Sequence, residues 1–219
     1  LQATTYEDIK ISPYDFYEIN QLKIEQSINE HGMLVITGKL DEEIKNKYVE
    51  ETDFGSTITV TQEQENNYKV LFQGIISDIQ VDQEGELNLI TIGAYSYTVL
   101  LDIKVKSRAF QNREMTYKAL VNDVLKDYDH AYAITKSEYD IPTETFLLQY
   151  KETDWQFLKR LASRFHQGLY ASVTTPYPGF IFGAPQLRAE GQIKKNKYTM
   201  RKNMNEYQQF CENESAHAM

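Results

Sequence analysis

The sequence predicts a mainly β protein of the α+β class, with a small tube-like β-barrel followed by an α+β part that carries two amphipathic helices. Three observations predict this class. The first hundred residues alternate apolar and polar side chains at strand spacing. Turn signals such as His31-Gly32 separate the apolar runs. The character of the sequence changes near residue 106, after which two long apolar stripes at helical spacing follow. We therefore expect a barrel domain over 1–106 and an α+β domain over 107–219.

About five strands are expected in residues 1–106, enough for a small barrel or sandwich. Residues 33–40 (MLVITGKL) form a short apolar run, which is typical of a buried strand. Ile58 and Val60 alternate with threonines in STITVT, a β-branched pattern that suits a pleated surface. Gly74 interrupts the next alternating run and predicts a bulge or a sharp bend. The polar stretch 41–51 is expected to form a short helix that covers one barrel opening.

The first amphipathic helix is expected over 116–128. Thr116 stands at its N-cap position. The helix carries one apolar stripe, which consists of Tyr117, Leu120, Val121, Val124, Leu125 and Tyr128.

The second helix is expected over 153–167, within the stretch YKETDWQFLKRLASRFHQGLYASV. Thr153 and Gln156 fit a capping box, and Asp154 places a negative charge at the positive end of the helix dipole. Gly168 is expected to end this segment in a left-handed conformation. The buried stripe consists of Trp155, Leu158, Leu161, Ala162 and Phe165, and a hairpin should follow over about 169–184. Folding alone explains these local signals, which makes a catalytic role less expected.

Composition and charge exclude several classes of function. The chain has 32 acidic and 23 basic residues, a net charge of −9, which opposes direct binding to nucleic acid. Cys211 is the only cysteine, so neither an internal disulfide nor a thiolate metal site is expected. The longest apolar runs fall short of the roughly 20 residues that cross a bilayer, so no membrane insertion is expected.

Signatures of catalysis are missing from the sequence. The four histidines (His31, His130, His166 and His217) show no pairing at metal-binding spacing, and neither a nucleophile elbow nor a phosphate loop occurs. We expect no catalytic residue, no bound metal and no cofactor, and we expect the protein not to be an enzyme. The 16 tyrosines either fill cores and strand faces or serve protein interfaces, and the sequence leaves both interpretations open.

Two segments resemble a known family. LLDIKVKSR followed by FQNREMTYKALVNDVL, and later QYKETDWQFLKRLASRFHQGLYASV, are similar to the baseplate hub proteins of contractile injection systems. That family includes the late control protein D type of tail hub in phages, its equivalent in phage-tail-like bacteriocins, and the N-terminal part of type VI secretion valine-glycine-repeat spikes. The resemblance implies a structural role for the residues that carry it: Arg108, Phe110, Asn112, Tyr150, Glu152, Thr153, Asp154, Trp155, Phe157, Leu158, Arg160, Leu161 and Gly168.

The resemblance implies a structural hub that joins the tail tube to the central spike as a symmetry adapter. Its implied partners are further copies in a homotrimer, the tail tube protein, the spike and a tape measure protein. Its implied location is the baseplate of a virion or tail-like particle that assembles in the bacterial cytoplasm. Family members are commonly longer, so the chain is either a compact hub or a truncated one, and the type of particle stays open.

Two other functions compete with the hub. A receptor- or glycan-binding β domain could use exposed tyrosines. A cell-wall hydrolase module of the same machine could use a pair of acids or Cys211.

Overall fold

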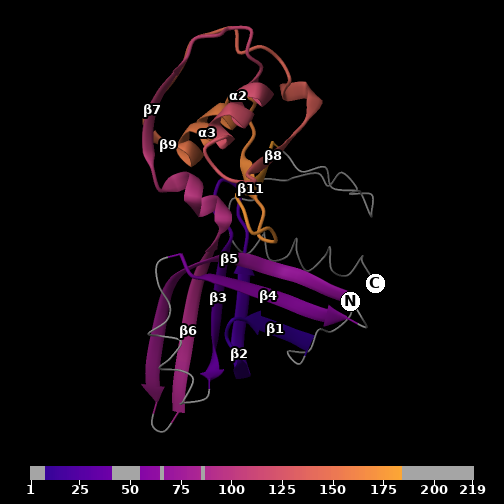
Figure 1. Ribbon diagram of the computed structural model, residues 1–219, viewed down its shortest axis with the longest axis vertical. Helices are drawn as coiled ribbons and strands as arrows, with labels where there is room; N and C mark the ends of the chain where they lie inside the picture. The colour runs from indigo at the N-terminus through magenta and orange to yellow at the C-terminus, as the bar shows by residue number, and fades with distance from the viewer. Residues whose placement is uncertain (1–7, 41–54, 65–66, 85–86, 184–219) are drawn as a thin grey trace, which may run out of the picture. The chain divides into compact units, whose positions relative to one another are not determined.

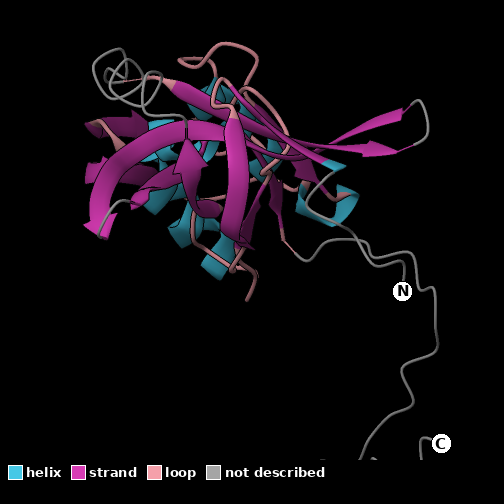
Figure 2. Ribbon diagram, turned by 90° about the horizontal axis from the view of Figure 1, so that it is seen from below, coloured by secondary structure: helices cyan, strands magenta, loops and turns pink. Residues whose placement is uncertain are grey.

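The computed structural model describes residues 8–40, 55–64, 67–84 and 87–183 (Figure 1). The N-terminal strands form a six-stranded sheet in the order β1-β4-β5-β6-β3-β2, whose paired neighbours are all antiparallel. The strands are β1 (Ile9–Ser12), β2 (Phe16–Glu25), β3 (Met33–Leu40), β4 (Thr57–Gln64), β5 (Asn67–Glu84) and β6 (Leu87–Ser96). Figure 2 shows strands that curve strongly, as in a nearly closed barrel. The helix expected over 41–51 lies outside the described residues.

Alternation of side chains builds the core of this sheet, because successive residues of a strand point to opposite faces. Along β3, every second side chain from Leu34 to Leu40 is buried. Ile58 and Val60 of β4 are fully buried between their threonines, as their pattern predicts. Phe72, Ile90 and Ile92 fill the same core from the neighbouring strands. The sheet stays open between β1 and β2, and a cavity of about 390 Å³ lies there, lined by residues 9–16 and Ile19.

The bend expected at Gly74 is distributed over two positions. The register of β5 shifts against β4 next to Val60, and it shifts against β6 between Ile76 and Asp78. Gly74 itself lies between the two shifts, and a Cβ there would run into the Phe72 ring. Glycine at this position is therefore required by close packing, while the irregularities fall on its neighbours.

Helices and short strands alternate in the second part of the chain. A 3-10 helix η2 (Tyr97–Asp102) leaves the sheet, and α2 (Tyr117–Leu125) and α3 (Asp154–Ser163) pack against each other. Two small sheets accompany them. One pairs β7 (Val105–Phe110) with β9 (Leu147–Thr153), and the other has the order β10-β11-β8, made of β10 (Leu169–Ala171), β11 (Gly179–Phe182) and β8 (Tyr132–Thr135). A short 3-10 helix η3 (Ser137–Tyr139) follows β8.

The two amphipathic helices share one core. The stripe of α2 is buried from Tyr117 to Leu125, while Tyr128 is only half-buried. On α3, Trp155, Leu158, Leu161 and Ala162 are buried as expected, and Phe157 adds a further buried ring. Together with the separate core of the sheet, these elements confirm the predicted α+β, mainly β class.

The end of α3 differs from expectation. The helix ends at Ser163, and the left-handed residue after it is His166, with φ +54°. Gly168 does not have a positive φ, so the prediction that it ends the helix in a left-handed conformation is wrong. Its small size is nevertheless needed, because an added Cβ would lie 2.8 Å from Asn29 Oδ1 and closer still to the Ile28 side chain. Packing against the turn after β2 therefore explains the glycine.

Candidate functional site

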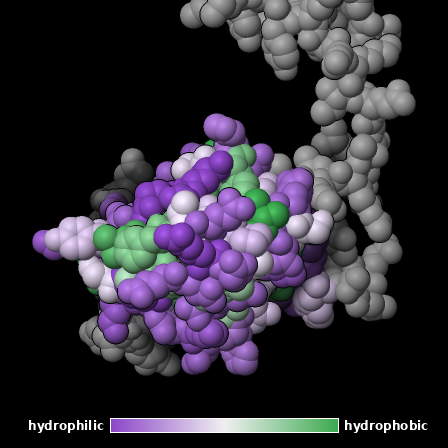
Figure 3. Space-filling model, turned by 90° about the horizontal axis from the view of Figure 1, so that it is seen from above, coloured by the Kyte–Doolittle hydropathy of each residue, from purple (hydrophilic) through white to green (hydrophobic). Residues whose placement is uncertain are grey.

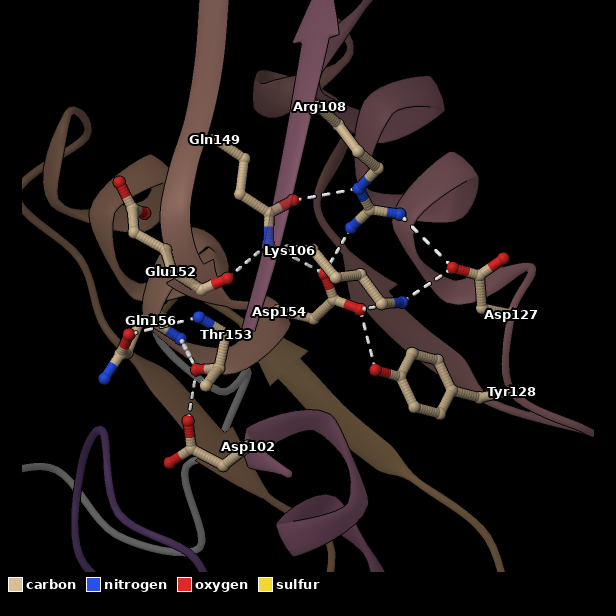
Figure 4. A network of polar contacts seen from close by, with 10 residues as sticks. All are labelled: Asp102, Lys106, Arg108, Asp127, Tyr128, Gln149, Glu152, Thr153, Asp154 and Gln156. Carbon is tan, nitrogen blue, oxygen red and sulfur yellow. Dashed lines mark hydrogen bonds and ion pairs between the residues drawn. The ribbon is translucent and has the colours of Figure 1, made fainter. Parts of the chain in front are cut away.

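The carboxylate of Asp154 lies at the centre of a polar cluster at the start of α3 (Figure 4). The capping box is present as expected: Thr153 Oγ1 accepts from Gln156 N at 3.2 Å, and Gln156 Oε1 accepts from Thr153 N at 3.1 Å. This cap fixes the first turn of α3 at the end of β9, because it satisfies amides that have no partner inside the helix. Asp154 follows directly and is fully buried.

Four side chains donate hydrogen bonds to the Asp154 carboxylate. Oδ1 accepts from Arg108 and from Gln149 Nε2, the latter at 2.9 Å. Oδ2 accepts from Lys106 Nζ and from the Tyr128 hydroxyl, both at 2.7 Å. The donors come from β7, β9 and the residues after α2. We call these five residues, with the exposed Asp127, the Asp154 cluster.

The register of β7 and β9 explains how the donors converge. Arg108 lies opposite Gln149, and Lys106 lies opposite Glu152, so side chains of both strands point to the same inner face. Arg108 Nε donates to Gln149 Oε1 at 2.9 Å, which orients the amide so that its NH₂ group faces Asp154. The Gln149 amide also donates to the Glu152 carbonyl at 3.0 Å. Each acceptor position of the buried acid is thereby served, as burial of a charge requires.

A second carboxylate outside the core shares the two cations. Asp127 accepts from Lys106 Nζ at 2.6 Å and lies 3.5 Å from Arg108 Nη1, and its side chain is 55 % exposed. Burial lowers the pKa of Lys106, but its hydrogen bonds to Asp127 and Asp154 outweigh burial and leave that pKa above the usual value. The same hydrogen bond lowers the pKa of Asp127. Lys106 is therefore charged at neutral pH, and it is held with Arg108 between the two acids.

Tyr128 is also tied to this cluster. Burial, followed by its hydrogen bond to Asp154, raises the pKa of Tyr128 to about 12. Lys106 Nζ lies 4.9 Å from the centre of its ring, within the range of a cation–π contact. The hydroxyl is thus a permanent donor at neutral pH.

Of the other residues singled out from the sequence, some lie beside the Asp154 cluster and some lie away from it. Phe110 stacks on Phe157 with ring centres 5.5 Å apart and an angle of 7°. Arg160 pairs with Glu152 at 3.0 Å and donates to the Leu148 carbonyl at 2.6 Å. Leu158 and Leu161 are fully buried.

Asn112 lies apart from them and accepts from the Glu114 amide at 3.0 Å in the turn after β7. Tyr150 points outward and is 60 % exposed.

A second polar group lies where the turn between β2 and β3 meets α3. The Trp155 indole is 1 % exposed and donates to the Asn29 carbonyl at 3.0 Å. His31 packs on Trp155 with ring centres 4.8 Å apart and reaches Asp102 Oδ2 at 3.3 Å. Asp102 Oδ1 accepts from the Thr153 hydroxyl. The acid at the end of the apolar run, which shows no partner in the sequence, therefore joins the cap of α3 to the turn.

Sequence reasoning missed the donors Lys106, Tyr128 and Gln149 as partners of Asp154. No local pattern marks them, because Tyr128 and Lys106 lie 26 and 48 residues away along the chain. The alternation of β7 offered one signal, since its charged residues Lys106 and Arg108 share a face with Phe110.

The hydrogen bonds of the Asp154 cluster, and those around Trp155 and His31, hold elements of the fold together, and we call this role a structural lock. Thr98, His31 and Asp102 form a hydroxyl–imidazole–carboxylate series, with His31 Nδ1 2.9 Å from Thr98 Oγ1. Thr98 is fully buried, however, so a substrate cannot reach its hydroxyl. Among the described residues, no group of three or more histidine, cysteine or acidic side chains could hold a metal ion. Cys211 lies outside the described residues. No described helix is both long and apolar enough to span a bilayer.

Comparisons with known proteins agree with this architecture. No curated protein sequence matches the chain. The 43 kDa tail protein of prophage MuSo2 from Shewanella oneidensis has a similar fold, with a TM-score of 0.57 and 16% identity over 78% of this chain and 51% of its own. A tail protein from Neisseria meningitidis MC58 matches with a TM-score of 0.56 and 11% identity, over 79% of this chain and 49% of its own. The chain thus spans about half the length of these structures.

A family model gives the assignment. Residues 49–175, more than half of the 219 residues, match the model described as phage tail baseplate hub (GPD). The match includes β7, α2, β9 and α3, the elements that build the Asp154 cluster. The resemblance seen in the sequence is thereby confirmed, and the chain belongs to the phage tail baseplate hub (GPD) family.

Proposed function

We propose that this chain is a non-enzymatic subunit of the baseplate hub that joins the tail tube to the central spike as a symmetry adapter. Copies of the chain associate into a trimer, and the tube protein, the spike and a tape measure protein are its further partners. The proposal places the protein in the baseplate of a tail or tail-like particle that assembles in the host cytoplasm. Family membership supports the structural role, and the surface described next supports the association.

The β7–β9 ribbon carries the proposal because apolar side chains are also found on its outward face, while its inward face combines polar residues with Phe110 and Leu147. A half-exposed antiparallel ribbon normally turns apolar residues inward and polar residues outward. Here Lys106, Arg108 and Gln149 face inward to Asp154, whereas the outward residues are mostly apolar. The large exposed apolar side chains of the ribbon and its flanks are Ile103 (55%), Val105 (63%), Phe146 (52%), Leu148 (43%) and Tyr150 (60%). We call this group the ribbon face.

An exposed apolar surface of this kind is stable in water only at a cost, and it marks a contact with another protein. Figure 3 shows apolar patches among hydrophilic side chains on one side of the molecule. The Asp154 cluster holds the ribbon from behind, so the ribbon face is presented by a rigid support. A rigid support lowers the entropy that association costs. The residues that resemble the family motif are, on this proposal, the structural support of an assembly surface.

The boundary between two domains, 1–106 and 107–219, belongs to the same proposal. Two hydrophobic cores support it, one in the sheet and one around α2 and α3, and among their buried residues Leu101 and Val173 pack across the boundary. A tube-like part would then contact the tail tube, and the helical part would fix neighbouring subunits.

The mass of the purified chain in solution, measured by light scattering over a range of concentrations, tests the proposal. The expected result is a species with three times the mass of one chain. Leu148→Lys with Tyr150→Lys should weaken this association, because two charges would be buried in the contact. Tyr17→Lys is the matched control, since Tyr17 on β2 is 67% exposed and lies outside the ribbon face. A stable dimer, or equal association of the ribbon variant and wild type, would contradict the proposal.

A further inference from the structure

The turn between β2 and β3 joins the two hydrophobic cores. Asn29, in a left-handed conformation with φ +67°, donates its amide to the Leu169 carbonyl at 2.8 Å and accepts from the Leu169 amide at 3.0 Å through Oδ1. Its carbonyl accepts from Trp155 Nε1. Gly32, at the other end of the turn, exchanges hydrogen bonds with Ser96. The turn is therefore bonded to both parts of the chain within a few residues.

His31 lies inside this joint, and its side chain is 12% exposed. The ring contacts Trp155 on one side. Nε2 faces Asp102 Oδ2, and Nδ1 faces Thr98 Oγ1. Thr98 Oγ1 lies 2.8 Å from Ser96 Oγ, which accepts from the Gly32 amide at 3.0 Å. These contacts form a continuous relay from a backbone amide of the turn to Asp102.

The direction of the hydrogen bonds in this relay is fixed by the groups at its two ends, the Asp102 carboxylate, which accepts, and the Gly32 amide, which donates. Asp102 accepts from Thr153, and its second oxygen faces His31, so a neutral His31 must carry its proton on Nε2. Nδ1 is then an acceptor, and the Thr98 hydroxyl must donate to it. Thr98 in turn accepts from the Ser96 hydroxyl, and Ser96 accepts from the Gly32 amide. With neutral His31, every hydrogen of the relay has an acceptor.

Protonation of His31 at Nδ1 breaks this order. Nδ1–H would donate to Thr98, which must then turn its own proton toward Ser96 Oγ. The Ser96 proton would lose Thr98 as its acceptor, and the hydrogen bonds of the described residues provide no other one. Ser96 is fully buried, so water cannot serve it, and an unserved buried donor costs about 1–3 kcal/mol.

The groups around His31 shift its pKa in both directions. Burial lowers its pKa below the usual value, against the hydrogen bond and the negative charge of Asp102 on η2. Lys159 on α3 lowers the pKa further, and Glu30 in the turn raises it. The net direction is downward, so the neutral relay is the form present at pH 7.

We propose that the joint between the two cores is a proton-sensitive latch, in which uptake of one proton by His31 releases the turn from Trp155 and Leu169 while both cores stay folded. The direction of the pH effect follows from thermodynamic linkage, because His31 binds a proton more tightly in the released turn than in the closed turn. Opening therefore becomes more frequent as pH falls below the ordinary histidine value of 6.5, by up to about tenfold per pH unit. A hub with this latch would change the connection between its two parts in acid without unfolding.

Trp155, the only tryptophan of the chain, reports on the latch directly. A charged imidazole quenches an adjacent indole more than a neutral one, so the Trp155 fluorescence should show an inflection below pH 6.5 in a titration of the full chain from pH 8 to 4. His31→Gln should abolish the inflection. His166→Gln, which changes an exposed histidine, should keep it. Hydrogen exchange, corrected for its intrinsic pH dependence, should accelerate at the Asn29 and Leu169 amides and stay constant at core amides.

Three outcomes would overturn the latch. They are a wild-type titration without an inflection, an inflection retained in His31→Gln, and exchange that accelerates equally in both cores. If His31→Gln fails to fold, NMR titration of the His31 ring in the wild-type chain decides: a pKa at or above 6.5 refutes the latch, and a lower value with local acceleration of exchange supports it.

Discussion

Replacement of Asp154 by asparagine should destabilise the fold far more than the same replacement of Asp127 in the Asp154 cluster. Asparagine keeps the size of the side chain but replaces one oxygen by an NH₂ group. Oδ1 faces Arg108 and Gln149, and Oδ2 faces Lys106 and Tyr128, so either orientation places donors against donors. Two hydrogen bonds are lost at a fully buried position, and two cations lose their buried partner.

Loss of one partner of a buried ion pair costs about 3–5 kcal/mol. Asp127 still neutralises part of the charge on Lys106 and Arg108, so the lower end, about 3 kcal/mol, is expected for Asp154→Asn. Asp127→Asn is the matched control because it removes a carboxylate from the same two cations. Its side chain is 55% exposed, so its loss should cost no more than about 1 kcal/mol.

Urea unfolding at pH 7, followed by circular dichroism, measures both free energies. The expected difference between the two variants is about 2 kcal/mol or more, since only one of the two acids is removed from water. Equal losses would refute the argument that burial of Asp154 makes the cluster a structural lock. An Asp154→Asn variant as stable as wild type would refute it more strongly.

Three further predictions concern residues around this cluster. Trp155→Ala should lower the free energy of unfolding by about 3–5 kcal/mol because the indole is buried, and a loss below about 1 kcal/mol in urea unfolding would contradict its role as a core residue. Tyr128 has a pKa of about 12 in the folded chain against an ordinary value of 10.0, so its contribution to stability is complete below pH 10 and is lost as pH rises toward 12. Tyr128→Phe should therefore flatten the fall in stability between pH 10 and 12. Gly32→Ala should cost about 1–3 kcal/mol because its Cβ would collide with Val173 Cγ1, and Val173→Ala in the same chain should recover part of that loss if the collision is the cause.

Local signals in the sequence predicted local structure well. The capping box of Thr153 and Gln156 and the burial of Trp155 depend on residues a few positions apart, and both are present. Asp154 was expected only as a charge at a helix end. Its main role depends on donors from other strands, which the register of β7 against β9 brings to one point.

Two other features depend on contacts that no local pattern encodes. Gly168 resembles a helix terminator in the sequence, but His166 adopts the left-handed conformation and Gly168 is small because the β2–β3 turn packs on it. His31 and Asp102 lie 71 residues apart, and only folding brings them together. Whether the thirteen residues that resemble the family motif act together in an assembled hub stays a prediction, which the ribbon-face variants address.

The length of strand β5 affects how the register of its two neighbouring strands is set during folding. Its first half pairs with β4 up to Ile75, and its second half pairs with β6 from Gly74 onward, so the two hairpins share almost no paired residues. A slip of one residue in a hairpin turns every side chain to the opposite face. Because only Gly74 and Ile75 are paired on both sides, we expect an error in one hairpin to disturb few pairs of the other. The register of each hairpin should therefore be set separately, although both hairpins use the same strand.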